Sequence, residues 1–195
     1  TFLSAFNYAV ITADSTIGIG LDMYLGSDCE FYPSIGIPQY AYQRFSKDYI
    51  LSDVIKGWYQ SEHDIDAEKN DFLSRMIYYG KQLYFTSVMV PQMQDSILTG
   101  YSKKQLEWCN NNSKQMWAFF IENKLFYSTR EMEYMKYIAD GHATQGFPEG
   151  APSRTAQWLG WKIVSAYMKN NSVKLKELLA EKDAQKILEK SGYKP

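Results

Sequence analysis

The sequence PSRTAQWLGWKIVSAYMKNN at residues 152–171 decides the fold. From Trp158 to Met168 only Lys162 is charged, and apolar side chains cover most of the helix surface that this spacing predicts. A helix that is apolar nearly all round packs on several sides. A glycine inside a helix costs about 1 kcal/mol relative to alanine, so Gly160 indicates that another backbone comes close. The stretch therefore predicts a central, buried helix.

The entrance to this helix is the best candidate site in the sequence. Pro152 and Ser153 suit the start of a helix, and Arg154 follows in the first turn. That turn carries the positive end of the helix dipole, so a cation there is unfavourable unless an acid or a bound anion offsets it. The preceding loop, DGHATQGFPEGAP at 140–152, contains His142. Arg154 is therefore expected either in a cleft or, as the simpler alternative, in a structural salt bridge or exposed to solvent.

The rest of the chain predicts an α+β fold that is mostly helical. A short apolar run at 7–12 and alternating apolar residues at 16–25 predict strands. Beyond a loop at 33–38 the pattern is helical, with helices expected near 46–58, 71–90, 102–121, 128–137, 173–180 and 183–190. Ser102 with Gln105, and Ser128 with Glu131, have the spacing of a capping box. We expect one domain over 1–195, with a small N-terminal β-sheet packed against a helical body.

Composition excludes several function classes. The chain has a net charge of −1, and residues 1–72 hold eleven acids and four bases, which does not indicate nucleic-acid binding. No apolar run reaches the roughly 20 residues of a membrane span. Cys29 and Cys109 match no metal-binding spacing, and they either form one disulfide or both stay free. Because the first residue is Thr1, we expect a chain that is either truncated or processed from a precursor by removal of a targeting segment.

Familiar catalytic motifs are absent from the sequence. It contains no HExxH, no Cys/His cluster, no glycine-rich phosphate loop and no GxSxG. His63 lies in a polar stretch and is expected to be exposed, whereas His142 lies in the loop before the central helix. Asp53 is flanked by apolar residues, which favours a hydrogen-bonded structural carboxylate. We expect no catalytic residue, no metal and no cofactor.

Seven segments together resemble the gliding-motility lipoprotein GldB family. They are LDMYLGSD (21–28), the helix with Asp53, Val54 and Trp58, MIYYGKQLYF (76–85), QLEWCNNNSKQMWAFF (105–120), YST (127–129), PSRTAQWLGWKIV (152–164) and DAQKILEKSGYKP (183–195). Their order and spacing cover nearly the whole chain. The resemblance implies a lipid-anchored, periplasm-facing envelope protein of diderm bacteria, whose anchoring cysteine lies in a precursor segment outside this chain.

The family in turn is similar to zinc metallopeptidases of the zincin type. Those enzymes bind zinc through an HExxH helix and a glutamate on a following helix. In this sequence the first helix has Asp53 and no histidine, and Tyr79 stands where the glutamate would be. A site without ligands does not hold catalytic zinc. The resemblance therefore implies a zincin-like fold with a degenerate site.

These patterns lead to a hypothesis for the site and for the function. The residues expected to line one cleft are Asp53, Tyr79, Lys81, His142, Arg154 and Trp158. Asp53 and Arg154 are expected to form an ion pair. The leading hypothesis is a non-enzymatic envelope domain that binds a protein partner in motility or secretion. The alternatives are a hydrolase using Asp53, His142 and Arg154, and a module that binds a peptide or a glycan in an aromatic groove.

Overall fold

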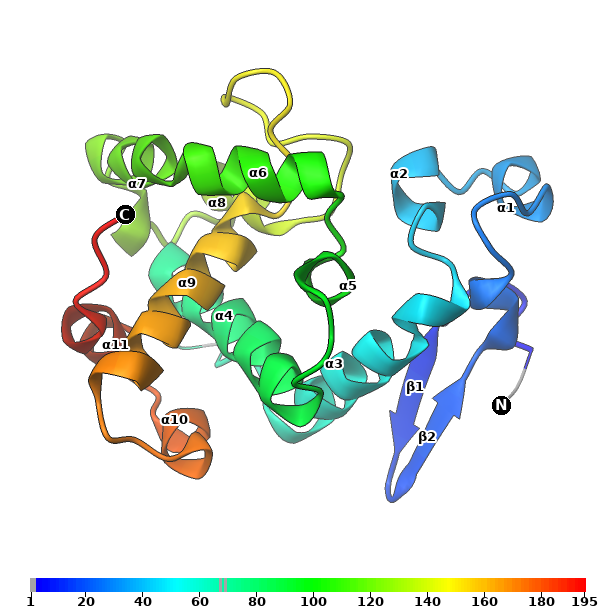
Figure 1. Cartoon of the computed structure of the whole chain (residues 1–195), viewed down its shortest axis with the longest axis horizontal. Coiled ribbons are helices and arrows are strands. Elements are labelled where there is room, and N and C mark those ends of the chain that lie inside the picture. The colour runs from blue at the N-terminus through cyan, green and yellow to red at the C-terminus, as the bar shows by residue number, and fades with distance from the viewer. Residues whose placement is uncertain (1–2, 67, 69) are drawn as a thin grey trace.

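The N-terminal part of the fold contains a β-hairpin. The computed structural model describes residues 3–66, 68 and 70–195 (Figure 1). Strands β1 (Val10–Ala13) and β2 (Thr16–Ile19) pair antiparallel, which confirms the expected small N-terminal sheet. β2 is shorter than the strand predicted at 16–25, because Leu21–Tyr24 forms a 3-10 helix. The buried carboxylate of Asp22 fixes this helix by accepting hydrogen bonds from the N-terminal segment.

Helices make up most of the fold. They are α1 (Phe31–Ser34), α2 (Gln39–Tyr42), α3 (Ile50–Glu62), α4 (Phe72–Met89), α5 (Asp95–Thr99), α6 (Lys103–Asn111), α7 (Ser113–Glu122), α8 (Glu131–Ile138), α9 (Thr155–Asn170), α10 (Leu175–Ala180) and α11 (Ala184–Ser191). Two further 3-10 helices cover Lys47–Tyr49 and Leu125–Tyr127. The mostly helical α+β fold class is therefore confirmed.

Two predicted helix boundaries need correction. The helix predicted at 102–121 is divided into α6 and α7 at Asn112, whose side-chain amide donates to the Trp108 carbonyl at 2.8 Å. The capping box of Ser102 and Gln105 at the start of α6 is confirmed. The box predicted for Ser128 is not formed, because its hydroxyl donates to Glu133 Oε2 at 2.6 Å and α8 begins only at Glu131.

The centre of the fold is the crossing of α4 and α9, where two glycines let the helix backbones touch. A Cβ atom added at Gly160 would lie 2.1 Å from the carbonyl oxygen of Met76. A Cβ atom added at Gly80 would lie 2.4 Å from the backbone of Gly160. Neither position has room for a side chain, which confirms that Gly160 permits a close backbone approach. Gly80, which the sequence argument did not single out, makes the matching contact from α4.

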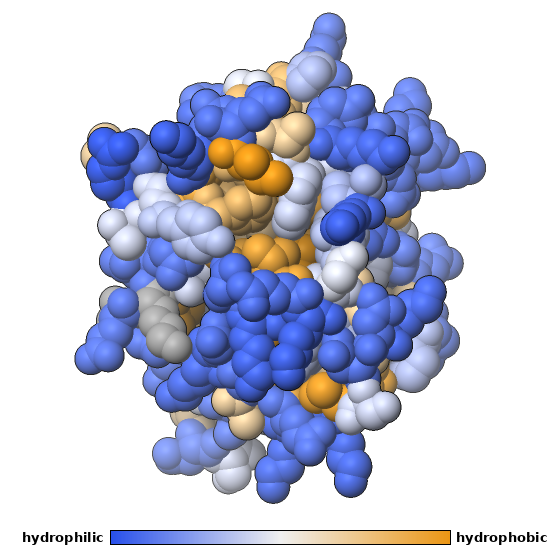
Figure 2. All heavy atoms as spheres, turned by 90° about the vertical axis from the view of Figure 1, so that its left-hand side faces the viewer, coloured by the Kyte–Doolittle hydropathy of each residue, from blue (hydrophilic) through white to orange (hydrophobic). Residues whose placement is uncertain are grey.

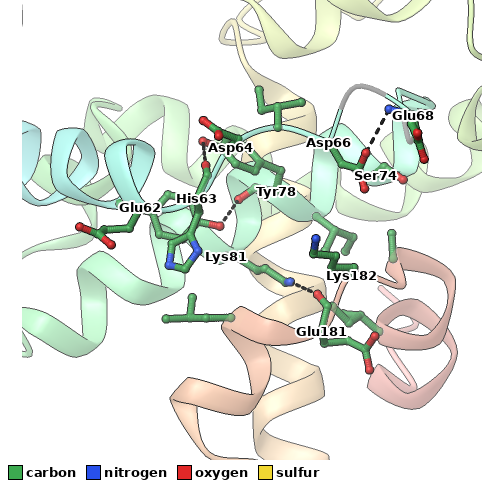
Figure 3. A pocket seen from close by; sticks show the side chains of 16 residues that line it. Glu62, His63, Asp64, Asp66, Glu68, Ser74, Tyr78, Lys81, Glu181 and Lys182 are labelled. Atoms are coloured by element: carbon green, nitrogen blue, oxygen red, sulfur yellow. Dashed lines mark hydrogen bonds between the residues drawn. The ribbon is translucent and has the colours of Figure 1, made fainter.

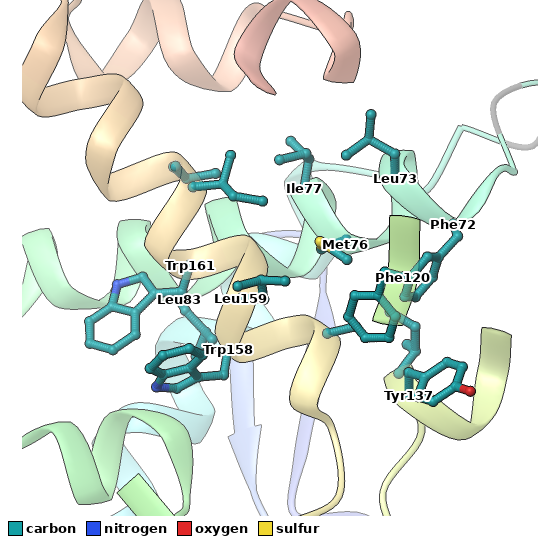
Figure 4. Packing of buried hydrophobic residues seen from close by; sticks show 14 of the residues in the cluster. Phe72, Leu73, Met76, Ile77, Leu83, Phe120, Tyr137, Trp158, Leu159 and Trp161 are labelled. Atoms are coloured by element: carbon teal, nitrogen blue, oxygen red, sulfur yellow. The ribbon is translucent and has the colours of Figure 1, made fainter. Parts of the chain in front are cut away.

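Apolar side chains surround this crossing and form the main core. Trp158 and Leu159 come from α9, Met76 and Ile77 come from α4, and an aromatic group that includes Phe120 covers their N-terminal end (Figure 4). The central, buried helix predicted from residues 152–171 is thus confirmed as α9. The core fixes the direction in which α9 begins, and this sets the position of Arg154.

Helix α3 joins the N-terminal part to the helical body. In Figure 1 the β-hairpin, α1 and α2 lie on one side of α3, and α4 to α11 lie on the other. Ile55 and Tyr59 of α3 pack with Phe85 and Val90 of the helical body. Gly57 faces Val10 of β1, so the sheet rests on α3. No helix in the described part of the chain is long and apolar enough to cross a membrane.

Candidate functional site

Arg154 is held in an unusual conformation at the first position before α9. Its φ angle of 60° is left-handed, a region that costs energy for residues other than glycine and that is enriched at functional sites. The side chain is only 13% exposed. Its Nε atom lies 3.3 Å from Asp140 Oδ1. Asp140 is therefore the acid that offsets a cation at the positive end of the helix dipole.

Asp140 ties three segments of the chain together. Its Oδ2 atom forms an ion pair with the guanidinium of Arg44, which follows α2 in the N-terminal part. Its Oδ1 atom also accepts a hydrogen bond from Ser153 Oγ at 3.2 Å. Arg44 and Arg154 thus share one carboxylate, and the three side chains together carry a net charge of +1.

Tyr101 supports Arg154 from the protein side. The guanidinium carbon of Arg154 lies 5.2 Å from the centre of the Tyr101 ring, within the range of a cation–π interaction. The Tyr101 hydroxyl donates a hydrogen bond to the Ser153 carbonyl at 2.5 Å. Burial raises the pKa of Tyr101, so the ring stays neutral, and burial lowers the pKa of Arg154. The aromatic face and Asp140 together hold the guanidinium at the entrance of α9.

These residues open into a pocket of about 380 Å³, which we call the arginine pocket. It lies between α2 and Tyr49 on one wall, the α5–α6 connection on another and the loop 140–154 on a third. Arg44 and Arg154 line it, and His142 lines it from an exposed position. Gly100 leaves space for both arginines, because a Cβ atom there would lie 2.7 Å from Arg44 Cδ.

Asp53 lies near the arginine pocket but is not the partner of Arg154. Its Oδ2 atom accepts a hydrogen bond from the Tyr24 hydroxyl at 3.0 Å. Burial raises the pKa of Asp53, and the charges of Lys56, Arg44 and Arg154 oppose this effect. The predicted ion pair of Asp53 with Arg154 is therefore wrong, because the loop before α9 supplies its own acid, Asp140. Asp53 contributes to the field around the pocket without lining it.

Tyr79 is too far along α4 to share a site with Asp53. Gln82 Nε2 donates to the Lys56 carbonyl at 3.2 Å, and the Tyr59 hydroxyl donates to the Tyr78 carbonyl at 3.4 Å. These contacts join the second half of α3 to residues 78–82 of α4, and Asp53 lies about one to two helical turns before them. Tyr79 packs beside the main core instead.

The other predicted cleft residues lie in separate places. Trp158 is a core residue that is 2% exposed. Lys81 lines a second pocket of about 560 Å³ between α3, α4 and the segment 179–187 (Figure 3). Of the six residues expected in one cleft, the structure therefore brings only His142 and Arg154 together in the arginine pocket.

Figure 3 shows Lys81 reaching from α4 to the carbonyl oxygen of Glu181, to which it donates a hydrogen bond. His63 lies on the opposite wall, and its carbonyl accepts a hydrogen bond from the Tyr78 hydroxyl at 3.0 Å. Burial lowers the pKa of Lys81 to about 8. Burial, and then the charge of Lys81, lower the pKa of His63, which is only partly buried and not fully exposed as expected.

The free energy of unfolding is expected to rise between about pH 8 and pH 10 because of Lys81. In this range the unfolded chain keeps the proton on Lys81, whose ordinary pKa is 10.5, while the folded protein releases it. Stability rises with pH wherever the unfolded state binds more protons. Urea titrations across this range should show a smaller rise for Lys81→Met than for the native chain. The exposed Lys104→Met is the control, and an equal rise in all three proteins would contradict the expectation.

A third pocket, which we call the apolar groove, lies on the opposite end of the molecule from α2. It has a volume of about 1050 Å³, and its walls come from α7, the 3-10 helix Leu125–Tyr127, α8 and Leu188. Figure 2 views the side where α7 and α11 lie and shows an apolar hollow surrounded by hydrophilic residues. The groove contains no residue of the predicted cleft.

The fold and the pockets define the class of this protein. It is a mostly helical α+β domain with a charged pocket at the start of its central helix. Within residues 3–66, 68 and 70–195 no group of three or more histidine, cysteine, aspartate or glutamate side chains is placed to hold a metal ion.

A family model described as gliding motility protein GldB matches residues 1–195, and the chain therefore belongs to the GldB family. Searches of curated proteins and of solved structures found no match. The family resemblance drawn from the sequence motifs is thus confirmed. The further similarity to zincin-type metallopeptidases is not shown by these comparisons.

Three residues of the arginine pocket escaped the sequence argument. Asp140 opens the loop that was singled out, and the need of Arg154 for an acid was a signal that pointed to it. Arg44 follows a helix of four residues and has no local pattern that marks it. Tyr101 belongs to the link between α5 and α6, and its contact with Arg154 depends entirely on the tertiary fold.

Proposed function

We propose that this chain is the non-enzymatic domain of a lipid-anchored envelope protein, facing the periplasm, which binds a protein partner at the arginine pocket. Membership of the GldB family supports a role in gliding motility or a related envelope process. The lipid anchor and the envelope location are part of the proposal. The proposal also includes the descent of the fold from a zincin-like enzyme that lost its zinc ligands.

One observation carries the proposal: Arg154 is strained, mostly buried and turned toward an open pocket. A left-handed arginine costs of order 1–3 kcal/mol, and such strain persists where it serves a site. Replacing the arginine by glycine would remove the strain at no steric cost. An arginine in this strained position, at the wall of a pocket, therefore favours a role in recognition.

The arrangement of the polar groups favours binding over hydrolysis. A general base must lie within hydrogen-bond reach of the group that it activates. Asp53 accepts its hydrogen bond from Tyr24 on a neighbouring wall, while His142 lies exposed on the loop. The two residues do not share a pocket, and Arg154 serves as a cation and not as a proton carrier.

Site-specific photo-crosslinking in the host organism tests the proposal. A benzoylphenylalanine in place of Tyr40, which lines the arginine pocket, is expected to give a defined crosslinked product. The product should be lost when Arg154→Gln is added. The same label at Met132, which is 95% exposed on α8, is the control and should not give that product. Products that are identical at both positions, or that persist with Arg154→Gln, would overturn the proposal.

A further inference from the structure

The guanidinium of Arg154 has hydrogen-bond donors that no residue in the described part of the chain accepts. An arginine side chain has five N–H donors. Among the described residues none accepts a hydrogen bond from Arg154, and its buried Nε atom is one of the few buried side-chain atoms without such a partner. The contact of Nε with Asp140 is an ion pair without the alignment of a hydrogen bond. Nε is buried and faces Asp140, so the donors that can meet an acceptor in the pocket are the terminal N–H groups of the guanidinium, which no described residue accepts.

The charge of the pocket selects an anion with a single negative charge. The charged side chains that line it, apart from His142, are Arg44, Arg154 and Asp140, with a net charge of +1. One negative charge neutralises this set. A phosphate with two negative charges would lie beside Asp140 without a matching cation, and like charges at close range repel strongly.

From these two observations we infer that the arginine pocket binds a carboxylate group, with Arg154 as the residue that recognises it. The inference rests on the proposed function and names the chemical group of the partner. A planar guanidinium matches a carboxylate through two parallel hydrogen bonds. The pocket volume of about 380 Å³ suits the end of a peptide chain or one acidic side chain. A chain end and an acidic side chain both present a carboxylate group.

Binding of short peptides to the purified chain, followed by NMR, tests this inference. The probes are acetyl-Ala-Ala with a free carboxyl end, its C-terminal amide, and acetyl-Glu-Ala amide. At least one of the two carboxylate peptides is expected to bind about tenfold more tightly than the neutral amide, since tenfold corresponds to one charge-assisted contact. The better of the two identifies the source as a chain end or a side chain.

Two variants show whether Arg154 is responsible. Arg154→Gln should reduce carboxylate binding about tenfold. Arg154→Lys should restore part of it, because lysine keeps the positive charge but lacks the planar guanidinium that makes two parallel hydrogen bonds. Arg130→Gln, which removes an 80% exposed arginine, should leave binding unchanged. If Arg154→Gln fails to fold, the comparison of acid with amide on the native chain still decides the inference.

Three results would overturn the inference: equal binding of acid and amide peptides, unchanged carboxylate binding by folded Arg154→Gln, or tighter binding of inorganic phosphate than of either carboxylate peptide.

The proposed function can fail independently of this inference. In one outcome, crosslinking at Tyr40 depends on Arg154 while acid and amide peptides bind equally. That result would support binding of a protein partner and would rule out recognition of a carboxylate. If carboxylate peptides bind but no crosslinked product forms, the pocket has a carboxylate ligand and the protein partner is wrong.

Discussion

Gly160→Ala is expected to lower the free energy of unfolding by about 1–3 kcal/mol, which is the usual cost of overpacking a core. The new methyl group would lie 2.1 Å from the Met76 carbonyl oxygen, which belongs to the backbone and cannot rotate away. Alanine favours a helix by about 1 kcal/mol over glycine, so a net loss means that the clash outweighs this gain. Gly160→Leu should cost more, because the larger side chain must separate α4 from α9.

Thermal unfolding followed by circular dichroism measures this effect. For a chain of this size a loss of about 1–3 kcal/mol lowers Tm by roughly 2–12 °C. Gly141→Ala is the control, because its added methyl group would meet no atom closer than 4.0 Å. A Tm for Gly160→Ala equal to or above that of the native chain would show that α4 and α9 do not touch at this glycine.

Asp140→Asn is expected to destabilise the protein by about 1–3 kcal/mol, since it leaves Arg44 and Arg154 side by side without a negative charge. Breaking a fully buried ion pair costs more, about 3–5 kcal/mol, but the Asp140 side chain is 37% exposed and water reduces the effect. Arg154→Met should cost less than Asp140→Asn, because Asp140 would keep Arg44 as its partner.

Urea unfolding of the single variants and of the double variant checks the shared carboxylate. Adding Arg154→Met to Asp140→Asn should recover part of the lost stability, because it removes one of the two repelling cations. Glu133→Gln is the control, since it removes the ion pair with the 80% exposed Arg130 but keeps an amide oxygen that can accept from Ser128, and it should change stability by less than about 1 kcal/mol. Equal losses for Asp140→Asn and Glu133→Gln would contradict the account of the arginine pocket.

The parts of the fold that could be predicted are those fixed by local sequence. The apolar surface of α9, the glycine at 160 and the capping box of α6 depend on residues a few positions apart, and each is found as expected. The break at Asn112 was missed, although the polar run at 110–115 marks it, because the asparagine ends α6 through its own side-chain amide.

The site could be predicted only in part, because pairing of charges is decided by tertiary structure. The sequence indicates that Arg154 needs an acid, but it does not show which acid the fold brings to it. Asp53 was chosen from its apolar surroundings, which in fact reflect its burial against Tyr24. Asp140 holds the role because its loop returns to the start of α9, and Arg44 joins it across a separation of 96 residues.

The contact between Gly80 and Gly160 also has a consequence for how the newly made chain matures. Helix α4 emerges from the ribosome well before α9, which lies about as far again along the chain. Until α9 arrives, the apolar side of α4 has no covering partner, and contacts between such distant segments form slowly. During synthesis the incomplete chain therefore exposes the apolar side of α4, and it stays prone to aggregation until α9 is available to cover it.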